Sequence, residues 1–159
     1  MLRLCFVCLG NICRSPTAHG VFLRLAEERG LLDRLVTDSA GTSAFHVGER
    51  PDARSQMAAR RRGFELPGVA RQFTAEDFSR FDLILAMDRT NRAALLAMAR
   101  TEEEARRVRL LRDFDPRSPR DADVPDPYYG GDAGFEEVLD ICEAACRGLL
   151  DYLERERRI

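Results

Sequence analysis

Residues 2–30 contain the feature that most constrains this chain: a strand, a tight loop and a helix in direct succession. The apolar run at 2–7, "LRLCFV", predicts a short buried strand. Ser15 and Pro16 are typical of the N-cap and the first residue of a helix. Apolar residues then recur at helical spacing until Gly30. The pattern predicts a β-loop-α unit with its loop at the carboxyl end of the strand.

Strand and helix patterns continue to alternate along the chain. Two further apolar runs, "LVTDSAG" and "FDLILAMD", predict buried strands, and "RVRLL" predicts a fourth strand. This alternation is typical of an α/β fold with a parallel sheet and right-handed crossovers. The expected strands lie at 35–41, 81–88 and 107–111, and the expected helices at 51–63, 89–99 and 135–156, with a capped turn at 74–77.

Residues 1–159 are expected to form a single domain. The chain is 45% hydrophobic, which suits one sizeable core, and it contains no repeat or interdomain linker. One long loop at 113–134 is rich in proline, aspartate and glycine, and such loops are usually functional or disordered. Ligands of parallel α/β sheets bind beyond the carboxyl ends of the strands, and the loop after residue 7 leaves the first strand at that edge.

Charge and cysteine content exclude several classes of function. The net charge is only −2, so nothing favours binding to nucleic acid or to a membrane surface. Five cysteines, an odd number, and the lack of a signal-peptide pattern predict a reducing, cytoplasmic location. No apolar run approaches the roughly 20 residues that cross a bilayer. The oligomeric state stays open.

The loop from Cys8 to Arg14 has the chemistry of an anion site. Its N–H groups converge at a helix N-terminus, where the helix dipole adds partial positive charge. Gly10 lets the chain curl, Asn11 tolerates a left-handed conformation, and the guanidinium of Arg14 can hold two phosphate oxygens. We expect Cys8 to be largely ionised there and to act as a nucleophile on a bound phosphate, with Ser15 donating its hydroxyl to the same sulfur.

A cysteine followed by five residues and an arginine is a weak signal in so arginine-rich a chain, so its context matters. Here "FVCLGNICRSP" resembles the signature of the low-molecular-weight protein tyrosine phosphatases. The resemblance continues in family order with "DSAGTS", "ARQFTAEDF", "FDLILAMD" and "DPYYGGDAGFEEV", over nearly the whole chain. It implies a three-layer α/β fold, a four-stranded parallel sheet with helices on both faces. It also implies hydrolysis of phosphotyrosine in proteins or peptides through a phosphocysteine, without a metal or other cofactor.

The resemblance further implies roles for individual residues. Cys8 is the nucleophile and Arg14 the clamp on the transition state. Asp126 is the general acid, which protonates the leaving phenol and then activates water. Aromatic walls around the pocket favour an aryl phosphate over the shorter phosphoserine. The positions that carry over as substrate-binding are Leu9, Gly10, Asn11, Ile12, Cys13, Ser15, Phe45, Tyr128 and Tyr129.

In the family, the loop that corresponds to residues 8–14 holds the phosphate and is called the phosphate loop here. Asn11 and Ser39 match the residues that support this loop through hydrogen bonds. Many members carry a histidine two residues before the alanine of an Ala-Arg-Gln triplet, and Gly68 stands at that place here. Glycine has no side chain to donate or accept a hydrogen bond. This difference from the family therefore affects the hydrogen-bond network around Asn11 and Ser39 and does not involve the nucleophile.

Several side chains have alternative readings. Cys13 matches a family cysteine that forms a reversible disulfide with the nucleophile and protects it from overoxidation, but it could instead be a small apolar filler. Asp121 and Asp123 are rivals of Asp126 as the general acid. The remaining side chains are expected to be core thiols or incidental histidines, although His46 could touch substrate: Cys5, Cys142, Cys146, His19 and His46.

Three other functions compete with phosphotyrosine hydrolysis. Arsenate reductases resemble this fold and loop but need further cysteines, and none occurs between Cys13 and Cys142. Protein-arginine phosphatases tend to have threonine where Ile12 stands. A non-catalytic phosphopeptide-binding module would lack the nucleophile or the acid, whereas both Cys8 and Asp126 are present. The physiological substrate stays open.

Overall fold

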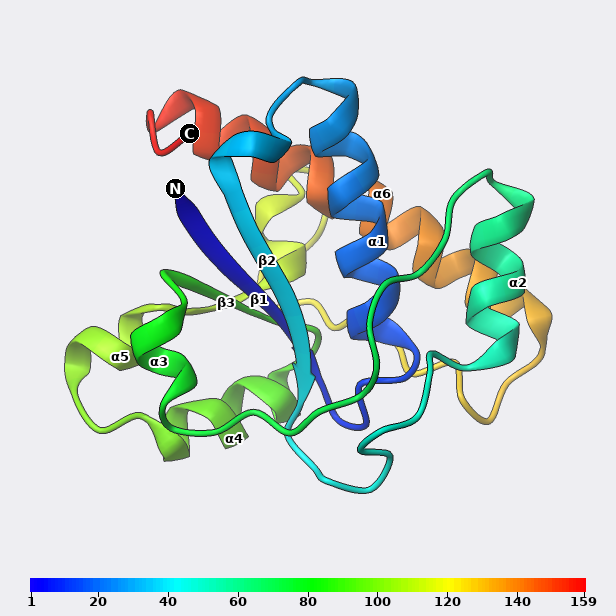
Figure 1. Cartoon of the computed structure of the whole chain (residues 1–159), viewed down its shortest axis with the longest axis horizontal. Helices are drawn as coiled ribbons and strands as arrows, with labels where there is room; N and C mark the ends of the chain where they lie inside the picture. The colour runs from blue at the N-terminus through cyan, green and yellow to red at the C-terminus, as the bar shows by residue number, and fades with distance from the viewer.

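A parallel sheet of four strands, in the order β2-β1-β3-β4, forms the middle of the computed structural model, which describes residues 1–159 (Figure 1). All three strand pairings are parallel, which confirms the predicted sheet. The strands are β1 (Leu2–Cys8), β2 (Leu35–Gly41), β3 (Leu83–Ala86) and β4 (Val108–Leu110). The helices are α1 (Arg14–Glu28), α2 (Ala53–Arg61), α3 (Asp77–Arg80), α4 (Arg89–Met98), α5 (Glu102–Arg106) and α6 (Asp132–Arg155), with short 3₁₀ helices η1 (Leu32–Arg34) and η2 (Leu111–Phe114).

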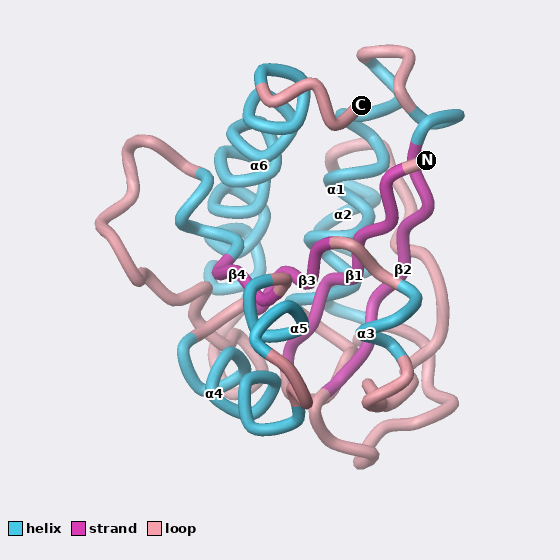
Figure 2. Tube along the Cα trace, turned by 90° about the vertical axis from the view of Figure 1, so that its left-hand side faces the viewer, coloured by secondary structure: helices cyan, strands magenta, loops and turns pink.

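Two hydrophobic cores lie on opposite faces of the sheet, because successive side chains of a strand point to opposite sides. Leu4 and Phe6 of β1 belong to the core under α1 and α6, whereas Cys5 and Val7 belong to the core under α3 and α4. Figure 2 shows α1, α2 and α6 on one side of the sheet and α3, α4 and α5 on the other. The predicted three-layer arrangement is therefore confirmed.

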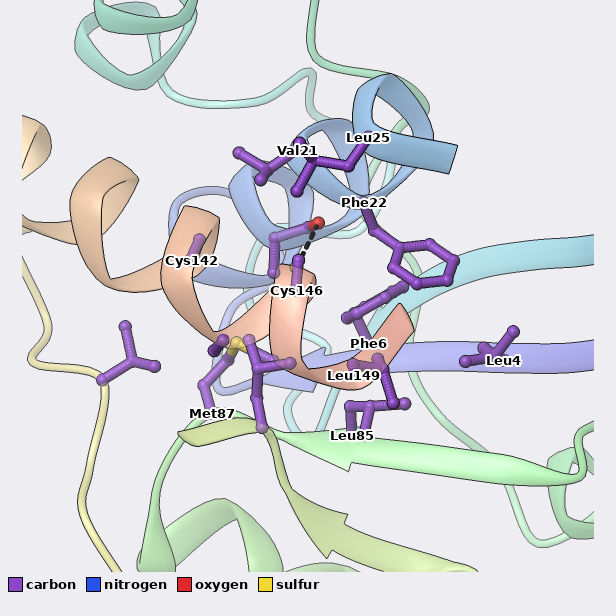
Figure 3. Packing of buried hydrophobic residues seen from close by; sticks show 14 of the residues in the cluster. Leu4, Phe6, Val21, Phe22, Leu25, Leu85, Met87, Cys142, Cys146 and Leu149 are labelled. Carbon is purple, nitrogen blue, oxygen red and sulfur yellow. Dashed lines mark hydrogen bonds between the residues drawn. The ribbon is translucent and has the colours of Figure 1, made fainter. Parts of the chain in front are cut away.

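The last helix supplies much of the larger core. Its thiols lie among the side chains of α1 and β1, and the Cys146 sulfur is 3.7 Å from the carbonyl oxygen of Ala18 (Figure 3). Cys5, Cys142 and Cys146 are fully buried, as expected of core thiols. Gly148 lets α6 lie directly on η2, since a Cβ at this residue would overlap the carbonyl group of Phe114. None of the helices combines the length and apolar character that spanning a bilayer requires.

The start of α1 differs from the prediction. The helix begins at Arg14 with Cys13 as its N-cap, so the expected N-cap, Ser15, lies inside the first turn. The Cys13 carbonyl already accepts a hydrogen bond from the main-chain N–H of Thr17 at 3.2 Å. The Ser15 hydroxyl is consequently not needed to cap the helix, and it is used in the site described below.

Other element boundaries shift by a few residues. The predicted 51–63 helix is the shorter α2, where Asp52 caps the first turn by accepting a hydrogen bond from the main-chain N–H of Arg54. The last helix begins at Asp132 instead of Phe135, because a carboxylate in the first turn is favourable to the helix dipole. The strand predicted at 81–88 is shorter, and α5 was not predicted because its sequence, EEEAR, has no apolar face.

Candidate active site

The loop of residues 9–13 joins β1 to α1 (Figure 1), and groups within it and just beyond it contact the sulfur of Cys8. Asn11 has a left-handed conformation, with φ of 58°, and its main-chain N–H donates to Cys8 Sγ at 3.3 Å. Ser15 places its Oγ 3.1 Å from the same sulfur. Cys8 is only 3% exposed and lies at the amino end of α1, where the helix dipole favours negative charge. This is the geometry that the sequence predicts for an anion site.

A buried hydrogen-bond network holds Asn11. Its Nδ2 donates to Ser15 Oγ at 2.7 Å and to Ser39 Oγ at 3.0 Å. Its Oδ1 accepts from the main-chain N–H of Arg71 at 3.1 Å. All polar atoms of the Asn11 side chain are thus paired, although Gly68 contributes no side chain. Gly68 itself has φ of 82°, a conformation that favours glycine over histidine.

Arg14 is almost completely buried beside the thiol. Its guanidinium donates to Asp88 Oδ2 at 2.5 Å and to the carbonyl oxygen of Val124 at 3.1 Å. Asp126 Oδ2 lies 3.7 Å from Arg14 Nη2. Burial by itself would lower the pKa of Arg14, but the nearby Cys8 sulfur and the Asp88 carboxylate raise it above its ordinary value. The Arg14 guanidinium therefore stays a cation, and its two hydrogen-bond acceptors fix its orientation beside Cys8.

Asp126 comes from the long loop before α6, and α2 holds that loop in place. The Asp126 Oδ1 accepts from the main-chain N–H of Tyr128 at 3.1 Å. Arg54 donates to the carbonyl oxygen of Tyr128 at 2.9 Å, and its guanidinium lies 5.5 Å from the Tyr128 ring centroid. The neighbouring Asp52 donates its main-chain N–H to the carbonyl of Ile12 at 2.8 Å. The start of α2 therefore ties the Asp126 loop to the phosphate loop.

The two rival carboxylates form ion pairs with arginines of α4. Asp121 pairs with Arg92 at 3.0 Å, and Asp123 pairs with Arg89 at 3.2 Å. Neither lines the cavity, whereas Asp126 does, with its side chain 45% exposed. Of the three aspartates, only Asp126 shares a cavity with Cys8.

These groups meet in one cavity of about 380 Å³. It brings together most of the residues expected to bind substrate, while Asn11 and Ser15 lie behind the wall. Phe45 and Tyr129 are 87% and 93% exposed, so they form the rim, not the floor. The lining residues are Cys8, Leu9, Gly10, Ile12, Cys13, Arg14, Ser43, Phe45, His46, Asp126, Tyr128 and Tyr129.

His46 is a wall residue that the sequence left as incidental. Its ring packs against Phe45, with centroids 5.4 Å apart, and its Nδ1 lies 2.8 Å from Glu49 Oε2. A Cβ on Gly10 would lie 2.9 Å from His46 Cδ2, so the imidazole can approach the phosphate loop this closely only because residue 10 is glycine. His19 lies on the core side of α1 and contacts Thr37 Oγ1 at 2.8 Å. Neither histidine belongs to a cluster of side chains that could hold a metal ion.

Cys13 shares the cavity with Cys8 and is buried. Burial raises the pKa of the Cys13 thiol to about 12, and the nearby Asp52 carboxylate adds to the rise. Cys13 is therefore a neutral thiol at physiological pH. The structure contains no disulfide, and all the cysteines are free.

Known proteins share this architecture over the whole chain. Residues 3–159 match the family described as low molecular weight phosphotyrosine protein phosphatase. A low molecular weight protein-tyrosine-phosphatase of Streptomyces coelicolor is 50% identical over 149 residues, which cover 93% of this chain and 91% of the relative. A crystal structure of a protein tyrosine phosphatase from Entamoeba histolytica, with Hepes in its active site, superposes with a TM-score of 0.94 at 38% identity, covering 99% of both chains.

A more distant relative has a different named activity. The YwlE arginine phosphatase, solved as a cysteine-to-serine mutant with a phosphorylated active-site serine, is 27% identical with a TM-score of 0.87 over 99% of both chains. Its lower identity separates it from the tyrosine phosphatases above. The match over residues 3–159 and the closer relatives agree with the cysteine-centred cavity. The chain therefore belongs to the low molecular weight phosphotyrosine protein phosphatase family of cysteine-dependent phosphatases.

Proposed function

We propose that the enzyme hydrolyses phosphotyrosine in proteins or peptides through a phosphocysteine on Cys8, with Asp126 as general acid and then general base. One observation carries the proposal: Asp126, from a distant loop, lines the same cavity as Cys8 and Arg14. A thiol, a fixed cation and a half-exposed carboxyl are the groups that such a transfer needs. In the related arginine phosphatase, a phosphorylated active-site serine in place of cysteine supports the nucleophile's role.

The first step transfers the phosphoryl group to sulfur. Arg14 and the N–H groups at the start of α1 hold the phosphate oxygens, and the Cys8 thiolate attacks phosphorus from the cavity floor. The S–P bond forms as the P–O bond to the phenol breaks. Asp126 gives its proton to the departing phenol oxygen, which leaves as neutral tyrosine.

The second step returns the enzyme to its starting state. Asp126, now a carboxylate, takes a proton from a water molecule as that water attacks phosphorus. The S–P bond breaks, and the Ser15 hydroxyl donates to the departing thiolate from 3.1 Å. Inorganic phosphate is released, and Asp126 is protonated again for the next cycle.

The cavity rim favours an aryl phosphate among the competing substrates. Tyr128 and Phe45 flank a slot through which a flat ring can bring its phosphate to the buried Cys8. The arsenate reductase alternative needs a further electron-carrying thiol beyond Cys13, and Cys5, Cys142 and Cys146 are fully buried. Ile12, with its apolar side chain at the cavity wall, favours the tyrosine phosphatase over the arginine phosphatase.

A side-by-side assay tests the proposal. Peptides of one sequence carrying phosphotyrosine, phosphoarginine or phosphoserine are compared by kcat/KM, with phosphate release as the measurement. We expect phosphotyrosine to lead the others by a factor of at least about 100, because only phosphotyrosine has a ring to pack against the aromatic rim, and the phosphoserine side chain is short for the buried sulfur. A lead by phosphoarginine would instead assign the enzyme to the competing activity.

Cys13 is proposed as the partner of Cys8 in a reversible disulfide. Hydrogen peroxide transfers one oxygen to the Cys8 thiolate, which becomes a sulfenic acid, and the other oxygen leaves as hydroxide. The Cys13 sulfur then attacks, the S–S bond forms, and the oxygen leaves as water with the thiol proton. Mass spectrometry of peroxide-treated protein should find the Cys8–Cys13 bridge, and dithiothreitol should restore activity. Irreversible sulfinic acid at Cys8, with no bridge, would contradict this role.

A further inference from the structure

A cluster of two aspartates and one arginine lies behind the phosphate loop, outside the cavity. Arg71 Nε donates to Asp38 Oδ2 at 2.9 Å, and its Nη1 donates to Asp77 Oδ2 at 3.0 Å. Burial by itself would raise the pKa of Asp77, but hydrogen bonds from Arg71 and from the main chain of Thr74 outweigh it and hold this pKa below its usual value. The Asp77 carboxylate is therefore a buried anion that fixes the arginine.

The main chain of Arg71 is held as firmly as its side chain. Its carbonyl accepts from the main-chain N–H of Gly41 at 2.8 Å, at the carboxyl end of β2. Its N–H donates to Asn11 Oδ1 at 3.1 Å. Asp38 adds a second tie to the same region, because its Oδ1 accepts from the main-chain N–H of Ser39 at 2.8 Å. The cluster thus fixes two of the groups that contact the Asn11 amide.

The Arg71 N–H fixes which way round the Asn11 amide lies. In an amide side chain only the oxygen accepts hydrogen bonds, so Oδ1 must face the Arg71 N–H, and Nδ2 must face Ser15 and Ser39. With both Nδ2 hydrogens donated, the Ser15 oxygen acts as an acceptor toward Asn11. Its own hydrogen is then free to point at Cys8 Sγ, 3.1 Å away. In the reversed amide, Ser15 would donate to Asn11 and have no hydrogen for the sulfur.

We propose that Arg71, clamped by Asp38 and Asp77, is a positioning residue that orients the Asn11 amide so that Ser15 donates to the Cys8 sulfur. This inference deepens the proposed function and rests on the roles given there to Cys8 and Ser15. Gly68 brings no side chain to this region, so the outer support of Asn11 comes from the main chain of Arg71. The hydrogen bond to sulfur matters most when the thiolate departs, which is the second step.

Arg71→Gln tests the inference because it removes both ion pairs. We expect kcat on an aryl phosphate to fall roughly tenfold, the effect of losing one charge-assisted hydrogen bond, while kcat/KM changes far less. The reason is that kcat/KM reports events up to phosphoenzyme formation, whereas kcat includes thiolate departure. Acid quenching during turnover should also trap a larger phosphoenzyme fraction than in the unmodified enzyme. Arg71→Lys, which keeps the charge, should recover part of the kcat.

Arg80→Gln is the matched control. Arg80 contacts the same carboxylate, Asp77, at 3.4 Å, but it is 62% exposed and does not touch Asn11. Its kcat and phosphoenzyme fraction should match those of the unmodified enzyme. If Arg71→Gln does not fold, Asp38→Asn provides the second variant, because Asp38 is 45% exposed and its loss leaves the buried Arg71–Asp77 pair intact. It should show the same split between kcat and kcat/KM at smaller amplitude.

The outcomes distinguish this inference from the proposed function. A folded Arg71→Gln enzyme in which kcat and kcat/KM fall equally, or in which neither changes, overturns the positioning role. An equal loss of kcat in Arg80→Gln overturns it too. Removal of any cation beside Asp77 would then have the same effect, whether or not that residue contacts Asn11. If the unmodified enzyme yields no phosphoenzyme on quenching, the proposed function fails and takes the inference with it.

Discussion

Cys8→Ser should reduce turnover of aryl phosphates by a factor on the order of 10⁴ or more, while inorganic phosphate still binds. A serine hydroxyl does not ionise near neutral pH, even at the amino end of α1. If it is phosphorylated, the resulting ester oxygen is a much poorer leaving group than a thiolate. Arg14, held by Asp88 at 2.5 Å, does not depend on the thiol for its position, so the anion site persists.

Two measurements check this expectation on the same protein sample. Release of phenol from an aryl phosphate gives turnover, and isothermal titration with inorganic phosphate gives the affinity of the anion site. An unchanged thermal unfolding midpoint serves as the control for folding. Multiple turnovers at a rate near that of the unmodified enzyme would contradict Cys8 as the nucleophile.

Asp126→Asn should reduce kcat/KM by roughly 10²- to 10³-fold for phosphotyrosine, but far less for 4-nitrophenyl phosphate. The amide keeps the size of the side chain and cannot give a proton to the leaving oxygen. Tyrosine is a poor leaving group without that proton, whereas nitrophenolate departs readily as an anion. Because kcat/KM ends at phosphoenzyme formation, the later role of Asp126 as a base does not mix into the comparison.

Asp123→Asn is the matched control on the same loop. Asp123 is three residues away, pairs with Arg89 and does not line the cavity, so both substrates should keep their kcat/KM. Equal losses for phosphotyrosine and nitrophenyl phosphate in Asp126→Asn would contradict the general-acid role. A leaving-group dependence that appears instead in Asp123→Asn would move that role to the rival aspartate.

The strands and the phosphate loop could be predicted from the sequence because their signals are local. "LRLCFV" and "FDLILAMD" are apolar runs of strand length, and Cys8, Gly10 and Arg14 lie within one loop. Asp126 depended on the family resemblance, since Asp121 and Asp123 offer the same chemistry nearby in the sequence. Without the resemblance, only the three-dimensional arrangement separates them, because it pairs the rivals with Arg92 and Arg89.

The family resemblance indicated Asn11 and Ser39 as supporting residues, but the supporting roles of Asp88 and Arg71 could not be predicted, because their partners are distant in the sequence. Asp88 was expected only to cap α4, and it does so through Oδ1, while its Oδ2 accepts from Arg14. The pairing of β1 with β3 brings the ends of these strands together. A prediction of that pairing would have placed Asp88 near Arg14. Arg71 reaches Asn11 through its main chain, which no side-chain pattern reveals. His46 belongs to no local motif, and it can line the cavity because Gly10 leaves space for its ring.

The position of α6 has a consequence for how the enzyme is made. Cys8 is synthesised well before Asp126 and the helix that packs on α1, because both lie far downstream of it in the chain. At roughly 5–20 residues per second, the ribosome exposes the Cys8 segment well before the core over α1 can close. A nascent chain that stops before residue 132 has the thiol but leaves Phe22 and Leu25 uncovered. The cavity and the closed core therefore form only after α6 has been synthesised, and we expect chains that stop before α6 to aggregate.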